Sequence, residues 1–169
     1  MKVTLLVVLL VGISNAARNV SVTVHNCTVP GDEGHVDSLT VNPVNIVVGE
    51  NFTITGQGSV VSNNDINNGI YNVSCVDANN NFQVFQASGS VCEDNHVQFP
   101  ANAGEFWFKG VNCPIKSGQY LVVVVTIQLH LDMPGGTFDV FISINDEDTQ
   151  KEIICVNGTM IVEPIRDIV

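Results

Sequence analysis

The stretch LVVVVTIQLHL, residues 121–131, decides the fold class of this chain. In its second half, apolar residues alternate with Thr126, Gln128 and His130, which is the period of a β-strand with one buried face. Its first half is apolar at every position, which predicts a central strand of a sheet. The polar residues interrupt the run too often for a membrane-spanning helix.

Similar short segments recur on both sides of this stretch, separated by Gly, Asn, Asp and Pro. They predict eight strands with little helix, which is typical of an all-β sandwich or barrel. The predicted strands are Val20–His25, Ser38–Asn42, Phe52–Val60, Ile70–Val76, Phe82–Ala87, Tyr120–Leu131, Thr137–Ile144 and Glu152–Glu163.

Two of these strands have long aliphatic faces. Leu121, Val123, Val125, Ile127, Leu129 and Leu131 share one face of the first, and Phe138, Val140, Ile142 and Ile144 share one face of the second. Two interpretations stay open at this point. The faces fill a sandwich core, or part of them lines a cavity for an apolar ligand.

The first sixteen residues have the three parts of a cleavable signal peptide: Lys2, an apolar run from Val3 to Ile13, and small residues in Ser14-Asn15-Ala16. The alternative is an uncleaved N-terminal anchor. We expect residues 1–16 to be the signal peptide and residues 17–169 to form one domain in an oxidising, non-cytosolic compartment.

Charge and motifs restrict the function. Six basic and 17 acidic residues give a formal net charge of −11, which disfavours nucleic acids and anionic membranes as partners. The chain has no GxSxG elbow, HExxH or P-loop, so we expect neither an enzyme nor a cofactor. Asp146-Glu147-Asp148 is interpreted as a solvated turn, with a calcium site as the alternative, and no other metal site is expected.

Five cysteines and five N-x-S/T sequons follow the predicted signal peptide. Four paired cysteines and one free thiol allow fifteen arrangements. The predicted glycosylation sites are Asn19, Asn26, Asn51, Asn72 and Asn157.

A glycosylated Asn on a strand must face water, so its chain neighbours face inward. Asn19 therefore turns Val20, Val22 and Val24 inward; Asn51 turns Phe52 and Ile54 inward; Asn72 turns Tyr71, Val73 and Cys75 inward. At Asn157 the pattern leaves Cys155 outside the apolar face, which predicts a bulge or a disulfide at the strand edge. This apolar face comprises Ile154, Val156, Met160 and Val162.

One aromatic segment falls outside the predicted strands. Phe106, Trp107 and Phe108 are consecutive, flanked by Gly104 and Gly110, and followed by Lys109. Consecutive residues of a strand face both ways, so at least one ring is expected to be exposed. The segment either caps the open end of the sandwich or forms a lid or membrane-contact loop.

Three elements resemble the ML domain, the MD-2-related lipid-recognition family. They are SLTVNP at 38–43 with VVGENFTI at 47–54, NCPIKSGQY at 112–120, and MPGGTF at 133–138 through Ile154-Cys155. The likeness is nearest to the phosphatidylglycerol/phosphatidylinositol transfer group, and it is related to the GM2 activator and NPC2-type carriers. It implies an immunoglobulin-like sandwich of two antiparallel sheets with a lipid cavity between them. It also implies the disulfides Cys27–Cys155 and Cys92–Cys113, with Cys75 free.

The resemblance implies a monomeric carrier, secreted or endolysosomal, that moves phospholipid between membranes through transient membrane contact. The alternatives are a sterol or glycolipid carrier of the same fold, and an extracellular recognition module with a filled core. Lys109 and Lys116 are the head-group candidates. The expected lining or mouth of the cavity comprises Phe52, Ile54, Tyr71, Val73, Phe106, Trp107, Phe108, Val123, Val125, Ile127, Phe138, Val140 and Ile142.

Overall fold

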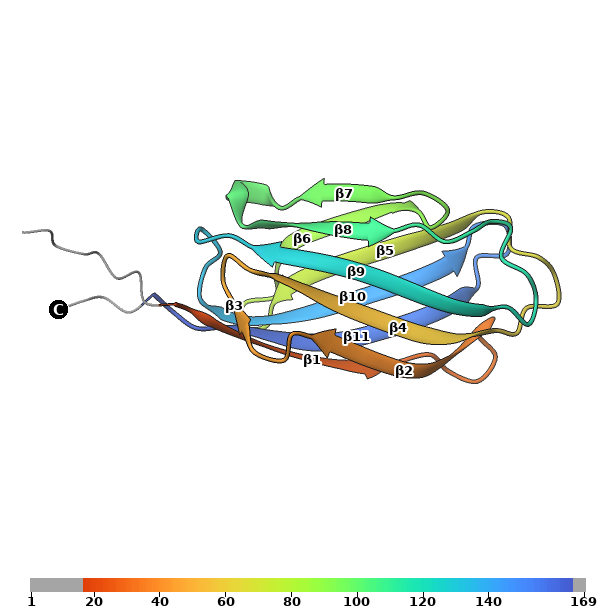
Figure 1. Ribbon diagram of the computed structural model, residues 1–169, viewed down its shortest axis with the longest axis horizontal. Coiled ribbons are helices and arrows are strands. Elements are labelled where there is room, and N and C mark those ends of the chain that lie inside the picture. The colour runs from red at the N-terminus through yellow and green to blue at the C-terminus, as the bar shows by residue number, and fades with distance from the viewer. Residues whose placement is uncertain (1–16, 166–169) are drawn as a thin grey trace, which may run out of the picture.

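The computed structural model describes residues 17–165 as two antiparallel β-sheets packed face to face (Figure 1). The predicted signal peptide lies outside the described residues. The two-sheet sandwich confirms the predicted fold class, and helical structure within 17–165 is limited to the 3-10 turn Pro100–Asn102. Residues 17–165 contain no helix that could span a bilayer.

The six-stranded sheet has the order β3-β1-β11-β10-β5-β6. Its strands are β1 (Asn19–Asn26), β3 (Ile46–Val47), β5 (Gly69–Asp77), β6 (Phe82–Ser90), β10 (Gly136–Asp146) and β11 (Glu152–Val162). The five-stranded sheet has the order β2-β4-β9-β8-β7. Its strands are β2 (Gly34–Asn42), β4 (Asn51–Val60), β7 (Asn95–Gln98), β8 (Gly104–Lys109) and β9 (Tyr120–Leu129).

The stretch that decides the fold forms β9, which lies at the centre of the five-stranded sheet as predicted. The strand ends at Leu129, two residues earlier than predicted. The chain turns there, since the N–H of His130 donates to the carbonyl of Ala103 and that of Met133 to the carbonyl of His130. Leu131 is consequently 60% exposed and does not share the buried face of the strand.

The facing of the sequons agrees with the prediction. Asn19, Asn26, Asn51 and Asn157 are exposed and Asn72 is half-buried, whereas the apolar residues beside them on their strands are buried or half-buried. Glycosylation of these sites remains a prediction.

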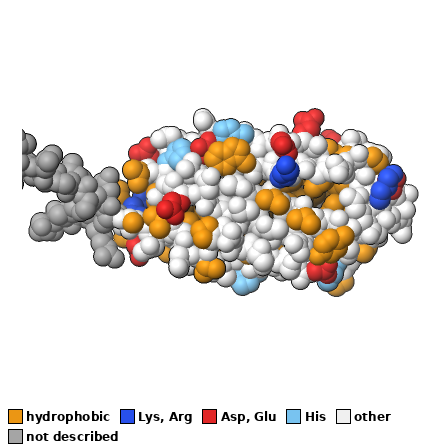
Figure 2. All heavy atoms as spheres, viewed as in Figure 1, with side chains coloured by type: hydrophobic (Ala, Val, Ile, Leu, Met, Phe, Trp, Pro, Cys, Tyr) orange, Lys and Arg blue, Asp and Glu red, His pale blue; other side chains and the backbone are white. Residues whose placement is uncertain are grey.

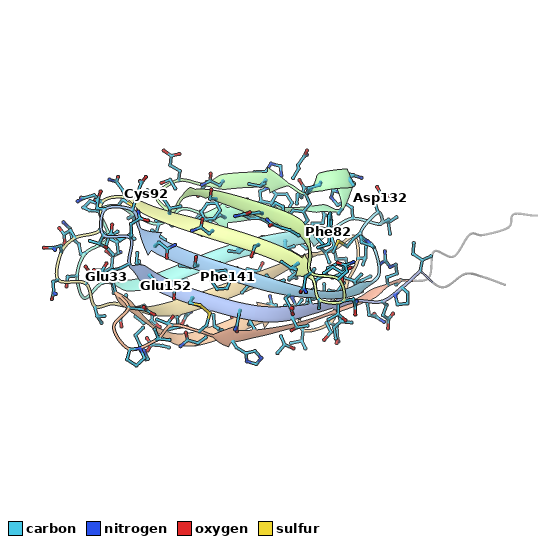
Figure 3. The ribbon with its side chains drawn as sticks, turned by 180° about the vertical axis from the view of Figure 1, so that it is seen from behind. Glu33, Phe82, Cys92, Asp132, Phe141 and Glu152 are labelled. Atoms are coloured by element: carbon cyan, nitrogen blue, oxygen red, sulfur yellow. A yellow bond between two sulfur atoms is a disulfide. The ribbon has the colours of Figure 1, made fainter. Side chains whose placement is uncertain are left out.

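Cys155 lies on the outer face of its sheet. It pairs in regular register with Ser143, and two residues later Asn157 pairs with Phe141, which is exposed and labelled in Figure 3. Both Cys155 and Asn157 therefore face outward. The bulge lies earlier, between Ile144 and Asn145, and β11 is an interior strand. The bulge or edge disulfide predicted at this point is therefore wrong; the bridge to Cys27 forms on the outer face, just beyond the end of β1.

The solvated turn predicted at Asp146-Glu147-Asp148 is present at Glu147 and Asp148, whereas Asp146 is the last residue of β10 and is buried. The buried Asp146 carboxylate accepts hydrogen bonds from the Thr149 hydroxyl (2.8 Å) and the Asp148 N–H (3.1 Å). These bonds stabilise the connection between β10 and β11. Within residues 17–165, no group of three or more His, Cys, Asp or Glu side chains is arranged to hold a metal ion.

Candidate functional site

The inner faces of the two sheets are apolar along most of their length. On the six-stranded sheet, Val73, Phe138 and Ile142 are buried; opposite them, Val123 and Val125 of β9 are buried. The β-strand period places these side chains in the space between the sheets, as the sequence predicts. This interior is the candidate binding site.

A cavity of about 40 Å³ lies between the sheets. Its lining comprises Val73, Cys75, Phe85, Phe99, Phe106, Val125, Ile127, Leu129, Val140, Ile142 and Met160. Most of these residues lie in the half of the sandwich nearer β9's end at Leu129. Phe82 and Asp132 mark this end in Figure 3, and Cys92 and Glu33 mark the opposite end.

A second cavity of about 20 Å³ lies beside the first. Its lining comprises Val22, Thr23, Val24, Phe52, Ile54, Ile127, Val140, Gly158, Thr159 and Met160. Ile127, Val140 and Met160 line both cavities, so these three side chains form the partition between them.

Both cavities are small for a ligand. A water molecule needs roughly 10–15 Å³, whereas pockets for organic ligands measure about 300–1,000 Å³. These two cavities therefore have room for a few water molecules, and a lipid can occupy them only if the sheets move apart.

The two long edges of the sandwich are held together differently. Along one edge β2 packs against β1 and β11 of the other sheet. At the opposite edge, β6 and β7 are linked at one end through the Cys92–Cys113 region and at the other by the rings of Phe85 and Phe99, 4.4 Å apart. The β6–β7 edge is therefore held by fewer contacts than the β2 edge, and fewer contacts must break there when the two sheets separate.

Both disulfides implied by the family resemblance are present. Cys27 is bonded to Cys155 and Cys92 to Cys113, and Cys75 is free and buried. Burial, with smaller contributions from the charges of Asp139 and Asp77, raises the pKa of the Cys75 thiol to about 11. The thiol is therefore protonated at neutral pH and serves as apolar lining of the cavity.

The aromatic segment is the strand β8 and neither a cap nor a lid. Phe106 and Phe108 face inward and are each 1% exposed. Trp107 lies between them and faces outward, where its ring stacks on His96 with centroids 5.0 Å apart. Trp107 therefore does not line the interior, because consecutive residues of a strand point to opposite faces.

The two lysines proposed for a head group lie away from the cavity. Lys109 ends β8 and is exposed on the outer face, and Lys116, in the loop between β8 and β9, pairs with Asp65 at 2.6 Å. Both lie toward the end of the sandwich that carries the disulfides, whereas the larger cavity lies toward the other end. The structure does not bring either lysine to the cavity lining.

A groove of about 280 Å³ crosses the outer face of the five-stranded sheet, the face seen in Figure 2. Its lining comprises Asp94, Asn95, His96, Trp107, Phe108, Lys109, Val124 and Thr126. Tyr120 and Val122 are exposed on the same face, 55% and 46% respectively. This surface combines charged, polar and apolar side chains, whereas the interior between the sheets is apolar.

A hydrogen-bonded network stabilises the corner beside Phe99. The Glu105 carboxylate lies 2.6 Å from Nε2 of His96 and 3.4 Å from Nε2 of His130. His130 contacts Asn102, whose amide donates to Asp132 (2.8 Å). The hydrogen bond to His96, followed by that to His130 and the charges of both rings, lowers the pKa of Glu105 below its usual 4.5.

We predict that Glu105→Gln reduces stability in a pH-dependent way. A carboxyl whose pKa is lower in the folded than in the unfolded protein stabilises the fold above its unfolded pKa, and this stabilisation is lost as the pH falls through the folded pKa. The difference in melting temperature between the wild type and Glu105→Gln should therefore be constant from about pH 5 to pH 6 and shrink below pH 4.5. A difference that grows on acidification would contradict this role.

Sequence reasoning missed several cavity residues, among them Phe85, Phe99, Leu129 and Met160. Leu129 and Met160 did belong to apolar faces recognised in the sequence. Phe85 lies on β6, where a bulge opposite Cys75 and Val76 breaks the alternation of inward and outward side chains. Phe99 lies in the β7–β8 connection, and no periodic pattern predicts its contact with Phe85.

The sequence and the fold of this chain are similar to those of known proteins. The family model described as "E1_DerP2_DerF2: ML domain" matches residues 21–162. A Niemann-Pick type C2 protein from Japanese carpenter ant has a similar structure, with 14% identity, a TM-score of 0.57, and coverage of 81% of this chain and 96% of that one. Chicken MD-1 complexed with lipid IVa is 17% identical, with a TM-score of 0.55 and coverage of 85% and 90%.

No match was found among curated protein sequences. At such low identities the two solved structures establish the shared fold, and the family model establishes kinship over most of the chain. The chain belongs to the ML domain family.

Proposed function

We propose that this protein binds a lipid between its two sheets and transfers it between membranes in a non-cytosolic compartment. The observation that carries the proposal is the pair of adjoining cavities between the sheets, the larger of which is lined only by apolar side chains and the protonated Cys75 thiol. The MD-1 structure, a similar fold complexed with lipid IVa, supports a lipid as the class of ligand. Two disulfides suit a secreted or endolysosomal protein.

Binding requires the interior to enlarge. In the proposed mechanism Phe85 and Phe99 separate, the β6–β7 edge opens, and an acyl chain replaces the small cavities. Burying the chain against Val125, Ile142 and their neighbours contributes about 0.8 kcal/mol per buried methylene group, which offsets the lost ring contacts. A phospholipid such as phosphatidylinositol or phosphatidylglycerol would keep its head group outside, near the opening.

The recognition-module alternative has one specific observation in its favour. The two cavities between the sheets are small, and the outer face carries a larger groove with exposed apolar residues beside it. A protein of this kind would bind a partner through the outer face and would take up no lipid.

A transfer assay separates the two functions. Purified protein is mixed with donor vesicles that contain labelled phosphatidylinositol or phosphatidylglycerol, and with acceptor vesicles; sterol-containing vesicles are run in parallel. We expect phospholipid transfer that rises with protein concentration and is faster than sterol transfer. Faster transfer of sterol than of phospholipid would show that sterol is the preferred ligand. If no lipid is transferred and none is bound to the protein, the proposal is refuted.

Val140→Phe should weaken lipid binding and thereby slow transfer. Val140 borders both cavities, and a phenyl ring at this position occupies the space where they adjoin. A lipid bound there would overpack the interior, which costs roughly 1–3 kcal/mol of binding free energy. This corresponds to an approximately ten- to hundredfold loss of lipid affinity. Val122→Phe is the matched control, since it makes the same change on the exposed face of β9. An equal loss of lipid affinity in both variants would show that the lipid does not bind between the sheets.

A further inference from the structure

Within residues 17–165, the buried hydroxyl group of one side chain, Tyr71, lacks a hydrogen-bond partner. Tyr71 is 0% exposed, and its hydroxyl oxygen has no hydrogen-bond partner among the described residues. Buried hydroxyl groups in native proteins nearly always have a partner, because leaving one unpaired costs about 1–3 kcal/mol. A missing partner of this kind points to a molecule that binds there.

Contacts with residues of both sheets hold the Tyr71 ring and direct its hydroxyl group. From the opposite sheet, Phe108 stacks on the ring with centroids 4.6 Å apart, and Phe106 meets it edge-on at 5.9 Å. On its own sheet, Tyr71 pairs with Gly89 of the edge strand β6. A Cβ atom at Gly89 would lie 2.8 Å from the hydroxyl oxygen, so the phenol lies across β6 where that strand has no side chain.

This position adjoins the candidate site. Val73, two residues along the same face of β5, lines the larger cavity, as does Phe106, which contacts the Tyr71 ring. The inner face of β6 bears Phe85, then Ala87, then Gly89, so its side chains become smaller toward the hydroxyl. Widening the β6–β7 edge would therefore open a path that ends at the Tyr71 hydroxyl.

We propose that the Tyr71 hydroxyl donates a hydrogen bond to an ester carbonyl of the bound lipid, which makes the protein selective for ester-linked over ether-linked lipids. This inference rests on the proposed lipid-binding function. An ester carbonyl is the polar group that lies directly beside an acyl chain, and it only accepts hydrogen bonds, which matches a phenol that has a proton to donate. Burial raises the pKa of Tyr71, so the phenol keeps this proton at neutral pH.

Two lipids and two variants test the inference. The probes are dioleoyl phosphatidylglycerol and its dialkyl ether analogue, which lacks both carbonyl groups. The variants are Tyr71→Phe and Tyr120→Phe; Tyr120 is the other tyrosine of the chain and is exposed. Affinities are measured by titrating purified protein with vesicles of each lipid in a neutral carrier lipid.

We expect the wild type and Tyr120→Phe to bind the ester lipid about tenfold more tightly than the ether lipid. Tyr71→Phe should bind both lipids equally, at the wild-type affinity for the ether lipid. Lipid-free Tyr71→Phe should unfold at the same or a higher urea concentration than the wild type, since the substitution removes an unpaired hydroxyl.

The outcomes separate this inference from the proposed function. If the wild type binds neither lipid, the proposed function fails. If the wild type binds both lipids equally, or Tyr71→Phe loses affinity for both to the same extent, lipid binding stands and the hydrogen bond to the carbonyl is refuted. In that case the hydroxyl is satisfied by water or serves only the packing of the ring.

Discussion

Replacing both Cys27 and Cys155 with serine should lower the free energy of unfolding by about 5 kcal/mol. The two cysteines are separated by 128 residues, so the bridge closes most of the chain into one loop and strongly restricts the unfolded state. In the chain-entropy model, a loop of about 100 residues or more is worth nearly 5 kcal/mol. A loss of this size is comparable to the whole stability of many domains.

The second bridge provides the comparison. Cys92 and Cys113 are separated by only 21 residues, so the same model gives about 3 kcal/mol for Cys92→Ser with Cys113→Ser. Urea unfolding followed by circular dichroism measures both double variants. A larger loss for the short loop than for the long one would show that local contacts of the bridges, and not loop length, decide their effect.

Phe106→Ala should destabilise the protein by about 3–5 kcal/mol, the range for a large buried aromatic side chain. The ring is 1% exposed, contacts Tyr71 and Phe85, and forms part of the cavity lining. The substitution enlarges the cavity because no other side chain fills the space left by the ring, and the surrounding strands can relax into that space only in part.

Trp107→Ala is the matched control on the same strand. Its ring is half-buried on the outer face, where it stacks on His96, so the expected loss is about 1 kcal/mol. Urea titrations of the two variants give the comparison. A loss for Trp107→Ala as large as that for Phe106→Ala would contradict the facing of β8.

The sequence predicted the strands that carry a clear apolar face. All eight predicted strands are present, with ends that shift by up to four residues. The three strands that it missed carry weak signals. Ile46–Val47 is too short to show a period, and Asn95–Gln98 is a mostly polar edge strand. In Gly104–Lys109, the three adjacent aromatics conceal the alternation because the outward Trp107 is itself apolar.

The cavity was harder to predict than the strands. Periodicity identified the inward side chains of β5, β9 and β10, because facing depends on local backbone geometry. Cavity volume depends on the separation of the sheets and on contacts between distant segments, such as that of Phe85 with Phe99. No pattern in the sequence encodes that separation, and none indicates that the Tyr71 hydroxyl is left without a partner.

The position of the lipid tests the account most directly. The probe is a phosphatidylglycerol with a photoactivatable diazirine near the end of one acyl chain. The protein is loaded with this lipid and irradiated, and the residues to which the lipid becomes attached are identified by peptide mass spectrometry. We predict attachment to inward side chains between the sheets, such as Val73, Val125 and Val140. Attachment to the outer groove at Trp107 or Val124, or no attachment at all, would contradict a lipid site between the sheets.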